Sequence, residues 1–157
     1  MNYLQSAQAL YEQMVRDRRH LHQHPEVGMD LPETCSYVMA RLTEMGYQPR
    51  RLGGGVTATV TGKPDGKVFL LRADMDALPM REESGLPFAS QRSCAHTCGH
   101  DCHMSIGLTV AKFIVDHKDE LCGRIKIVFQ PAEEGVRGAN AVAESGVLDD
   151  VDYFVGS

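Results

Sequence analysis

The stretch KVFLLRADMD, residues 67–76, decides the fold. Its apolar run VFLL lacks polar alternation, which is typical of a strand that is buried on both faces of a sheet. The run leads into three charged residues, Arg72, Asp74 and Asp76. Because open α/β sheets place their chemistry at the carboxyl ends of such strands, the stretch predicts a buried strand with a functional site at its end.

Helix and strand patterns alternate on both sides of this stretch. Apolar residues three and four apart predict an amphipathic helix over residues 4–21. A second helix is expected to begin near Asp30, with Asp30 and Glu33 as a capping box and Gly46 as its stop. Further helices are expected over residues 104–117, capped by Asp101, and over 141–146; further strands are expected within 47–52, 56–60, 124–130 and 151–156. This alternation predicts an α/β fold, a mixed sheet flanked by helices.

Glycine clusters separate the early strands. Gly53-Gly54-Gly55 lacks the Gly-Lys-Ser/Thr continuation of a phosphate-binding loop, so it is interpreted as a turn. Residues 62–66, GKPDG, predict a second tight turn.

Composition excludes several classes of protein. The 157 residues suit a single domain, and a net charge of −5 without a basic stripe argues against nucleic-acid binding. The N-terminus has no continuous apolar run, so neither a signal peptide nor a membrane span is expected, and a cytoplasmic location follows by default. The five cysteines are odd in number and unevenly spread, which favours reduced thiols over a disulfide framework.

The segment CAHTCGHDCH, residues 94–103, is dense in metal-ligand residues. Cys98 and His100 precede a predicted helix, and thiolate and imidazole are preferred ligands of zinc. The sequence QPAEEG adds Glu133 and Glu134 at the end of an apolar strand, where two carboxylates would repel one another unless a cation or proton lies beside them. One carboxylate holding a metal while the other faces water suits hydrolysis, since a metal lowers the pKa of bound water to about 7. A solvated pair in a surface loop is the alternative.

Asp74 allows two interpretations as well. It caps a turn, or it orients a metal-bound histidine from the end of its strand, as carboxylates beside metal ligands do. The second interpretation is favoured.

Four motifs, in this order along the chain, resemble the M20 family of metallopeptidases and amidohydrolases, in its aminoacylase-like and hippurate hydrolase-like branch. They are RRHLHQHPE with Gly28, RADMDALP, HTCGHDCH, and FQPAEEG followed by Arg137-Gly138-Ala139. The resemblance implies a zinc-exopeptidase-like sandwich and two divalent metal ions, Zn²⁺ or Mn²⁺. It also implies a homodimer that hydrolyses the amide bond of small N-acyl amino acids or conjugates, such as hippurate-, N-acetyl-amino acid- or aminobenzoyl-glutamate-like substrates.

The same resemblance implies a role for each motif residue. Cys98, His100 and Glu134 become metal ligands, Glu133 the general base, and Asp74 a catalytic carboxylate beside the ligands. Arg72 stands where other branches carry a histidine ligand. Asp76, Asp101 and His103 also belong to the motifs and are expected to have structural or supporting roles. Cys94 and Cys102 are not expected to be ligands.

Family members are longer than this chain and supply two further histidine ligands and a lid domain. Residues 1–157 are therefore expected to be the N-terminal part of a catalytic domain, with the lid and dimerisation domain and the C-terminal part absent and the fold incomplete. Such a chain is expected to expose core surface and to be catalytically poor on its own.

Two other chemistries stay open. Cys98 would be a nucleophile with His100 or His103 as its base, or Cys94, Cys98, Cys102 and a histidine would close a structural zinc site. The histidines within residues 20–24 are interpreted as a structural corner rather than as ligands.

Overall fold

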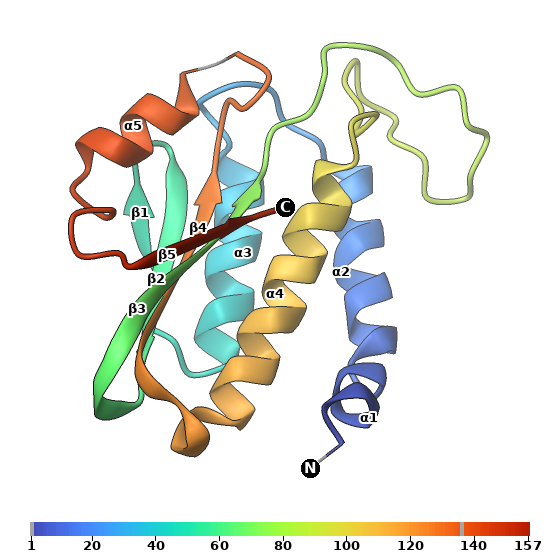
Figure 1. Ribbon diagram of the computed structural model, residues 1–157. Helices are drawn as coiled ribbons and strands as arrows, with labels where there is room; N and C mark the ends of the chain where they lie inside the picture. Colours follow the sequence, from blue (N-terminus) through green and yellow to red (C-terminus); the bar gives the residue numbers. More distant parts are fainter. Residues whose placement is uncertain (1, 136) are drawn as a thin grey trace.

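The chain folds into one mixed five-stranded sheet with helices on both faces, as the computed structural model shows for residues 2–135 and 137–157 (Figure 1). The strands lie in the order β1-β2-β4-β3-β5. The strands are β1 Arg50–Leu52, β2 Gly55–Thr61, β3 Lys63–Asp74, β4 Cys122–Gln130 and β5 Tyr153–Gly156. The helices are α1 Tyr3–Gln8, α2 Tyr11–Gln23, α3 Pro32–Glu44, α4 His100–Asp116 and α5 Gly138–Glu144, with a 3₁₀ turn at Lys118–Glu120. The predicted α/β class is confirmed.

Strand β3, which contains the opening stretch, lies between β4 and β5 and is parallel to both. Val68 and Leu70 are buried on the face that α5 covers. Phe69, on the opposite face, is 39% exposed and stacks on Tyr153. Burial of VFLL on both faces was therefore wrong at Phe69, because its ring packs against Tyr153 of the exposed edge strand β5 rather than beneath a helix of the described residues.

Strand β4 lies between β2 and β3, although β2 and β3 are consecutive in the sequence. It pairs antiparallel with β2 and parallel with β3. The predicted turn over residues 62–66 is confirmed only in part, since Lys63 already belongs to β3 and pairs with Cys122. The Gly53-Gly54 turn joins β1 to β2 as expected.

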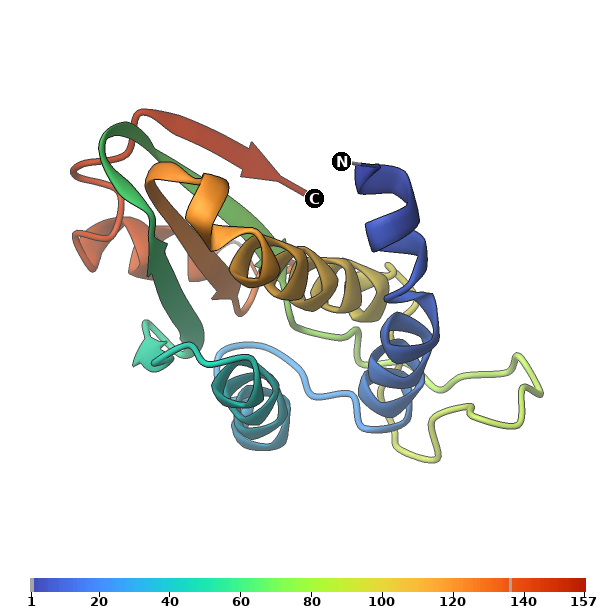
Figure 2. The same ribbon diagram turned by 90° about the horizontal axis from the view of Figure 1, so that it is seen from below.

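Helices cover both faces of the sheet. Helices α3 and α4 cover one face, α2 packs against α4, and α5 covers the other face (Figure 2). Phe129 of β4 and Leu108 of α4 are fully buried in the larger core between the sheet and α3 and α4. At the edge of the sheet, Tyr153, Phe154 and Val155 of β5 are exposed. Among the described residues, no helix has the length and apolar character needed to cross a bilayer.

The helix boundaries correct three local predictions. The helix expected over residues 4–21 is two helices, because α1 ends in a tightened turn in which Leu10 N–H donates to the Ala7 carbonyl. Helix α3 begins at Pro32 without a side-chain cap from Asp30. The carboxylate of Glu26 instead accepts the N–H groups of Glu33 and Thr34, at 3.2 and 2.8 Å.

Asp101 does not cap α4, since the N-cap residue is Gly99. Its carboxylate lies in the first helical turn and contacts His22 and Arg18 of α2. The tertiary partners thus outcompete the capping role. The predicted stop at Gly46 is confirmed, because Gly46 has a positive φ of 92° and directly follows the C-cap of α3.

Candidate metal centre

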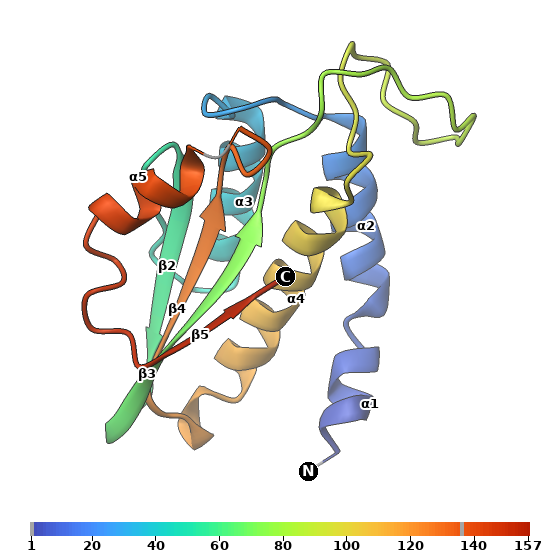
Figure 3. The same ribbon diagram turned by 45° about the horizontal axis from the view of Figure 1, so that its top comes forward.

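The predicted site residues gather where β3 and β4 end beside the N-terminus of α4. Because the two strands are parallel, their carboxyl ends meet at one edge of the sheet, with Asp74 paired to Gln130 (Figure 3). Asp74 ends β3, and Glu133 and Glu134 follow β4 after a short turn. Residues 75–99 leave this edge, project away from the sheet and return to α4.

Cys98, His100 and Glu134 lie together. One potential ligand atom from each lies within 4.8 Å of the others. His100 is buried, whereas the other two side chains face solvent. The structure therefore brings together the three residues that the sequence selected as a ligand set, and their ligand role stays a prediction.

His100 presents one ring nitrogen to this group. Its Nδ1 lies 2.7 Å from the Asp76 carbonyl oxygen, which leaves Nε2 available as a ligand atom. Carboxylate oxygens of Asp74, Glu133 and Glu134 lie 3.6, 3.8 and 3.9 Å from Nε2. Burial lowers the pKa of His100, but the neighbouring Asp76 and Asp74 outweigh burial and raise it. The position thus favours a positive charge.

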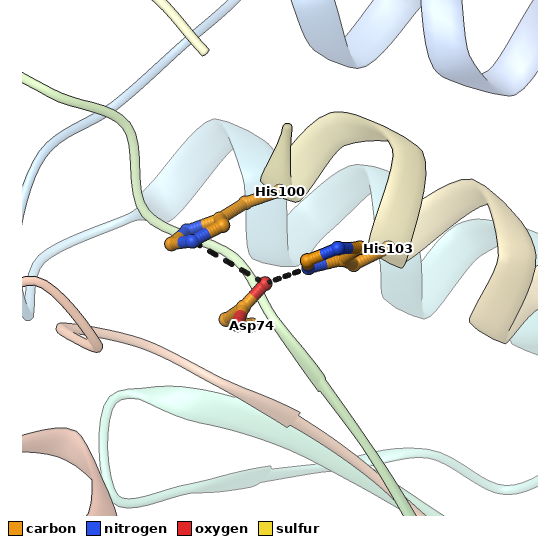
Figure 4. Close-up of side chains that lie close together, drawn as sticks. All are labelled: Asp74, His100 and His103. Atoms are coloured by element: carbon orange, nitrogen blue, oxygen red, sulfur yellow. Dashed lines mark hydrogen bonds and ion pairs between the residues drawn. The ribbon is translucent and has the colours of Figure 1, made fainter. Parts of the chain in front are cut away.

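Asp74 lies at the end of β3, as expected, and faces two histidines. Its Oδ1 lies 2.7 Å from His103 Nδ1 and 3.6 Å from His100 Nε2, while Oδ2 accepts from Arg72 (Figure 4). Asp74, His100 and His103 thereby form a second group with potential ligand atoms within 4.8 Å. The Asp76 carbonyl orients His100, whereas the Asp74 carboxylate contacts His103 at 2.7 Å, and the role of Asp74 beside a metal-bound histidine stays a prediction.

Asp76 fixes the loop that carries the glutamate pair. Its Oδ1 accepts the N–H of Glu133 at 2.8 Å, and Oδ2 accepts the N–H of Glu134 at 3.3 Å. Burial raises the pKa of Asp76, but the hydrogen bonds from His100 and from these two amides outweigh burial and lower it. The sequence signal for this role of Asp76 was its spacing of two residues from Asp74, because a two-residue step keeps both carboxylates on one side of an extended chain.

The glutamate side chains are less buried than the sequence implied. Glu133 is 41% exposed and Glu134 is 31% exposed. Solvent therefore partly screens their mutual repulsion. Their arrangement around His100, rather than this repulsion, favours a cation at the site. The hydrogen bond with the Glu134 carboxylate raises the pKa of the Cys98 thiol, and burial raises it further. Without a cation, the thiol therefore keeps its proton more firmly.

The backbone is in unusual conformations on both sides of the site. Gly99, between Cys98 and His100, has a φ of 87°, which glycine adopts without steric cost. Ala132, directly before the glutamate pair, has a φ of 47° and is buried. Such a conformation in a residue with a Cβ is a local strain of the kind that gathers at functional sites.

The other histidines and cysteines lie outside the group formed by Cys98, His100 and Glu134. His20 stacks between Tyr37 and His24, which agrees with the structural corner that was expected. All five cysteines are free, as predicted, and the Cys94 thiol donates to a backbone carbonyl. Neither Cys94 nor Cys102 belongs to a potential metal-binding group within residues 2–135 and 137–157. A three-cysteine zinc site therefore lacks support.

His96 is a buried polar residue to which the sequence analysis gave no role. Neither ring nitrogen has a hydrogen-bond partner within the described parts of the chain. Burial lowers the pKa of His96 to about 4, so its ring is neutral at neutral pH.

The sequence and the fold match one family of known proteins. Residues 70–157 match the family described as peptidase family M20/M25/M40. The chain is 43% identical over 150 residues to the N-acetyl-L-cysteine deacetylase of Bacillus subtilis, covering 94% of this chain and 36% of the relative. It is 50% identical over 112 residues to a p-aminobenzoyl-glutamate hydrolase homolog of Haemophilus influenzae, covering 66% of this chain and 26% of the relative.

A solved structure shows the same fold. The Bacillus subtilis YXEP protein, described as a dinuclear metal binding peptidase from the M20 family, superimposes with a TM-score of 0.91 at 37% identity. The superposition covers 95% of this chain and 43% of that protein. The chain thus spans less than half the length of each of these three proteins. From its motifs, its sheet topology and these matches, the chain belongs to the M20 peptidase family.

Proposed function

We propose that the protein hydrolyses the amide bond of small N-acyl amino acids or related conjugates, such as N-acetyl-amino acids, hippurates or aminobenzoyl-glutamate, in a reaction that depends on divalent metal ions. The convergence of Cys98, His100 and Glu134, with Glu133 beside them, carries the proposal. The relatives named as a deacetylase of N-acetyl-L-cysteine and as a p-aminobenzoyl-glutamate hydrolase homolog support the substrate class.

The donor set fits a divalent transition metal. Thiolate, imidazole and carboxylate are all zinc ligands, and the same set accepts manganese through its carboxylate. His100 Nε2 is free because the Asp76 carbonyl occupies Nδ1. Cys98, His100 and Glu134 would hold the ion, which would act as a Lewis acid that activates water and polarises the amide carbonyl.

Glu133 is the residue placed to move a proton. Its carboxylate lies 3.8 Å from His100 Nε2, so it borders the ligand group, and it is exposed enough to reach water. Asp76 fixes its backbone at 2.8 Å, which limits the directions the side chain can take. As general base, Glu133 would take a proton from the attacking water and pass it to the leaving amine.

A second ion needs further donors. The two potential ligand groups share His100, whose single free nitrogen cannot serve two ions. We therefore propose that residues 1–157 form the N-terminal part of the catalytic domain, and that chain beyond them completes a two-ion site of Zn²⁺ or Mn²⁺ in a homodimer. The YXEP protein's description as dinuclear supports this proposal.

One substitution tests the proposed function. In the full-length protein, Glu133→Gln keeps the size of the side chain and removes its basicity, so hydrolysis of N-acetyl and N-benzoyl amino acids should fall at least ~10²-fold while bound metal is unchanged. The matched control, Glu134→Gln, should lower metal content. Undiminished hydrolysis in metal-loaded Glu133→Gln would refute the role of Glu133.

The rival nucleophile chemistry is disfavoured by the surroundings of Cys98. Nucleophilic cysteines lie in electropositive sites that lower their pKa, whereas Glu134 raises the pKa of Cys98. Alkylation separates the two chemistries, because bound metal protects a ligand thiol from iodoacetamide. Equal alkylation with and without Zn²⁺ would favour the nucleophile.

A further inference from the structure

One buried imidazole on α2 contacts both ends of the segment that carries two of the proposed ligands. The His22 side chain is 6% exposed. Its Nε2 lies 2.9 Å from the Glu82 carboxylate, and its Nδ1 lies 2.7 Å from the Asp101 carboxylate. Cys98 and His100 lie between these two acidic residues in the sequence. The segment 82–101 is therefore tied at both ends to a single ring.

The first tie organises the start of the segment. The second oxygen of Glu82 accepts the N–H of Ser90 at 2.6 Å, and the Ser84 hydroxyl donates to the first. Glu82 thus closes a loop over residues 82–90. Phe88 within this loop packs against His22 edge-on, with ring centroids 5.6 Å apart. In Figure 1 this part of the chain projects beyond the sheet, beside the carboxyl end of α2.

The second tie fixes the end of the segment. Asp101 is fully buried, and its Oδ2 lies 2.7 Å from Arg18 Nε as well as from the His22 ring. Asp101 directly follows the proposed ligand His100 in the first turn of α4. A shift of Asp101 would therefore turn the His100 backbone.

The chemistry of the ring makes it a poor candidate for replacement. Each of its ring nitrogens lies within hydrogen-bond distance of a carboxylate, so one rigid ring joins two acidic groups. No other side chain of similar length carries two nitrogen atoms in one rigid ring. Removing the ring would also leave two carboxylates close to each other in a largely buried space, where their repulsion is weakly screened.

We infer that His22 is a positioning residue for the metal centre: it clamps Glu82 and Asp101 so that Cys98 and His100 face Glu134. The inference rests on the proposed metal centre for its effect on ligands, whereas the clamp itself is a property of the fold. His22 contacts none of the proposed ligand side chains through a hydrogen bond or ion pair within the described residues, so it acts through Asp101 and Glu82.

Cobalt binding measures the effect on the ligands. Co²⁺ reports thiolate ligation by a charge-transfer band and ligand geometry by its visible bands. In His22→Gln the affinity for Co²⁺ should fall about 10–100-fold, the usual effect of removing a group that supports metal ligands. The thiolate band should also weaken at saturating Co²⁺. A loss of stability alone would leave the saturated spectrum unchanged.

A matched control separates positioning from general destabilisation. Arg41→Gln removes another ion pair of α2, in which Arg41 Nε lies 2.9 Å from the buried Asp17 carboxylate. This pair is remote in sequence from segment 82–101, so the variant should lose stability and keep the Co²⁺ affinity and spectrum. The milder variant Glu82→Gln keeps the shape of the Glu82 side chain but removes its charge and weakens its contact with the His22 ring, so it serves if His22→Gln does not fold.

Hydrogen exchange of the metal-free protein tests the clamp independently. His22→Gln, or Glu82→Gln in its place, should speed exchange within residues 82–101, and Arg41→Gln should not. Unchanged exchange there, or a Co²⁺ affinity and spectrum equal to wild type, overturns the inference. Wild-type protein that binds no Co²⁺ through a thiolate overturns the proposed metal centre instead, and exchange then decides the clamp alone.

Discussion

Replacing Asp76 with asparagine removes a charge from the residue that joins the two halves of the site. The wild-type carboxylate accepts one N–H at 2.8 Å and another at 3.3 Å, from Glu133 and Glu134. Asparagine has one oxygen, so it can accept only one of these bonds and turns an N–H₂ donor toward the other. The substitution is close to isosteric, which limits any packing effect.

The magnitude follows from the two bonds. The retained bond to Glu133 changes from charge-assisted to neutral, a loss of about 1–1.5 kcal/mol, and the longer bond to Glu134 contributes about 0.5–1 kcal/mol that disappears. We therefore expect Asp76→Asn to lower the free energy of unfolding by about 2 kcal/mol. Asp76→Ala, which removes both acceptors, should lower it by about 3–4 kcal/mol.

Urea unfolding of the metal-free protein at neutral pH measures the difference, and a chelator keeps adventitious metal from adding stability. The control is Asp152→Asn, because Asp152 also accepts a strand N–H, that of Val68 at 2.8 Å, but lies at the surface. The control should change the free energy of unfolding by less than Asp76→Asn does, because solvent screens the Asp152 carboxylate.

The pH dependence gives a second check on the same carboxylate. The pKa of Asp76 lies below its ordinary value of 3.8, so its contribution is complete above that value and is lost as the pH falls through the lower, folded-state pKa. The difference between wild type and Asp76→Asn should therefore shrink below about pH 4. If Asp76→Asn stays within about 0.5 kcal/mol of wild type at neutral pH, the two hydrogen bonds do not stabilise the loop and the reasoning fails.

Three further predictions concern other parts of the molecule. Gly107→Ala in α4 would place a Cβ 3.1 Å from the Phe129 ring. We expect this overpacking to outweigh the gain in helix propensity, so the free energy of unfolding should fall by about 1 kcal/mol in thermal or urea unfolding. A more stable variant would contradict this expectation. Gly99→Ala has open space around its Cβ but a left-handed backbone, so the free energy of unfolding should fall by about 1–2 kcal/mol and Co²⁺ binding should weaken. Unaltered Co²⁺ binding would show that this turn does not position the ligands. Burial raises the pKa of Glu82, but hydrogen bonds from Ser84, His22 and the N–H of Ser90 outweigh burial and lower the pKa to about 2. The stability that Glu82 contributes should therefore be present above its ordinary pKa of 4.5 and disappear toward pH 2. Glu82→Gln should flatten that part of a stability-against-pH curve.

The elements with a strong local signal could be predicted from the sequence. The apolar runs of β3 and β4 and the stop at Gly46 follow from patterns within a few residues, and the structure agrees with them. Cys98 and His100 could be selected because they are two residues apart before a helix. Glu134 joined them through the resemblance of FQPAEEG to the family motif, because the residues alone left open which of the two glutamates would hold a metal.

The predictions that failed depended on distant partners. Asp101 matches a helix cap in its local sequence, yet its carboxylate meets His22, 79 residues earlier. Glu26 caps α3 from outside the window in which capping boxes are sought. The supporting role of Asp76 likewise depends on a distant partner, since only the folded loop shows that its carboxylate receives the N–H of Glu133.

The insertion of β4 between β2 and β3 has a consequence for folding kinetics. Hairpin contacts between β2 and β3 would have formed early and locally, but here β2 has only β1 as a partner, and β3 waits until the chain has passed through α4 and returned as β4. Closing such a long loop before β3 has a partner slows folding and raises the contact order. The edge that gathers Asp74 with the glutamate pair therefore exists only once this late strand has docked. We expect nascent or partly folded chains to lack metal affinity, so that metal uptake follows folding rather than guiding it.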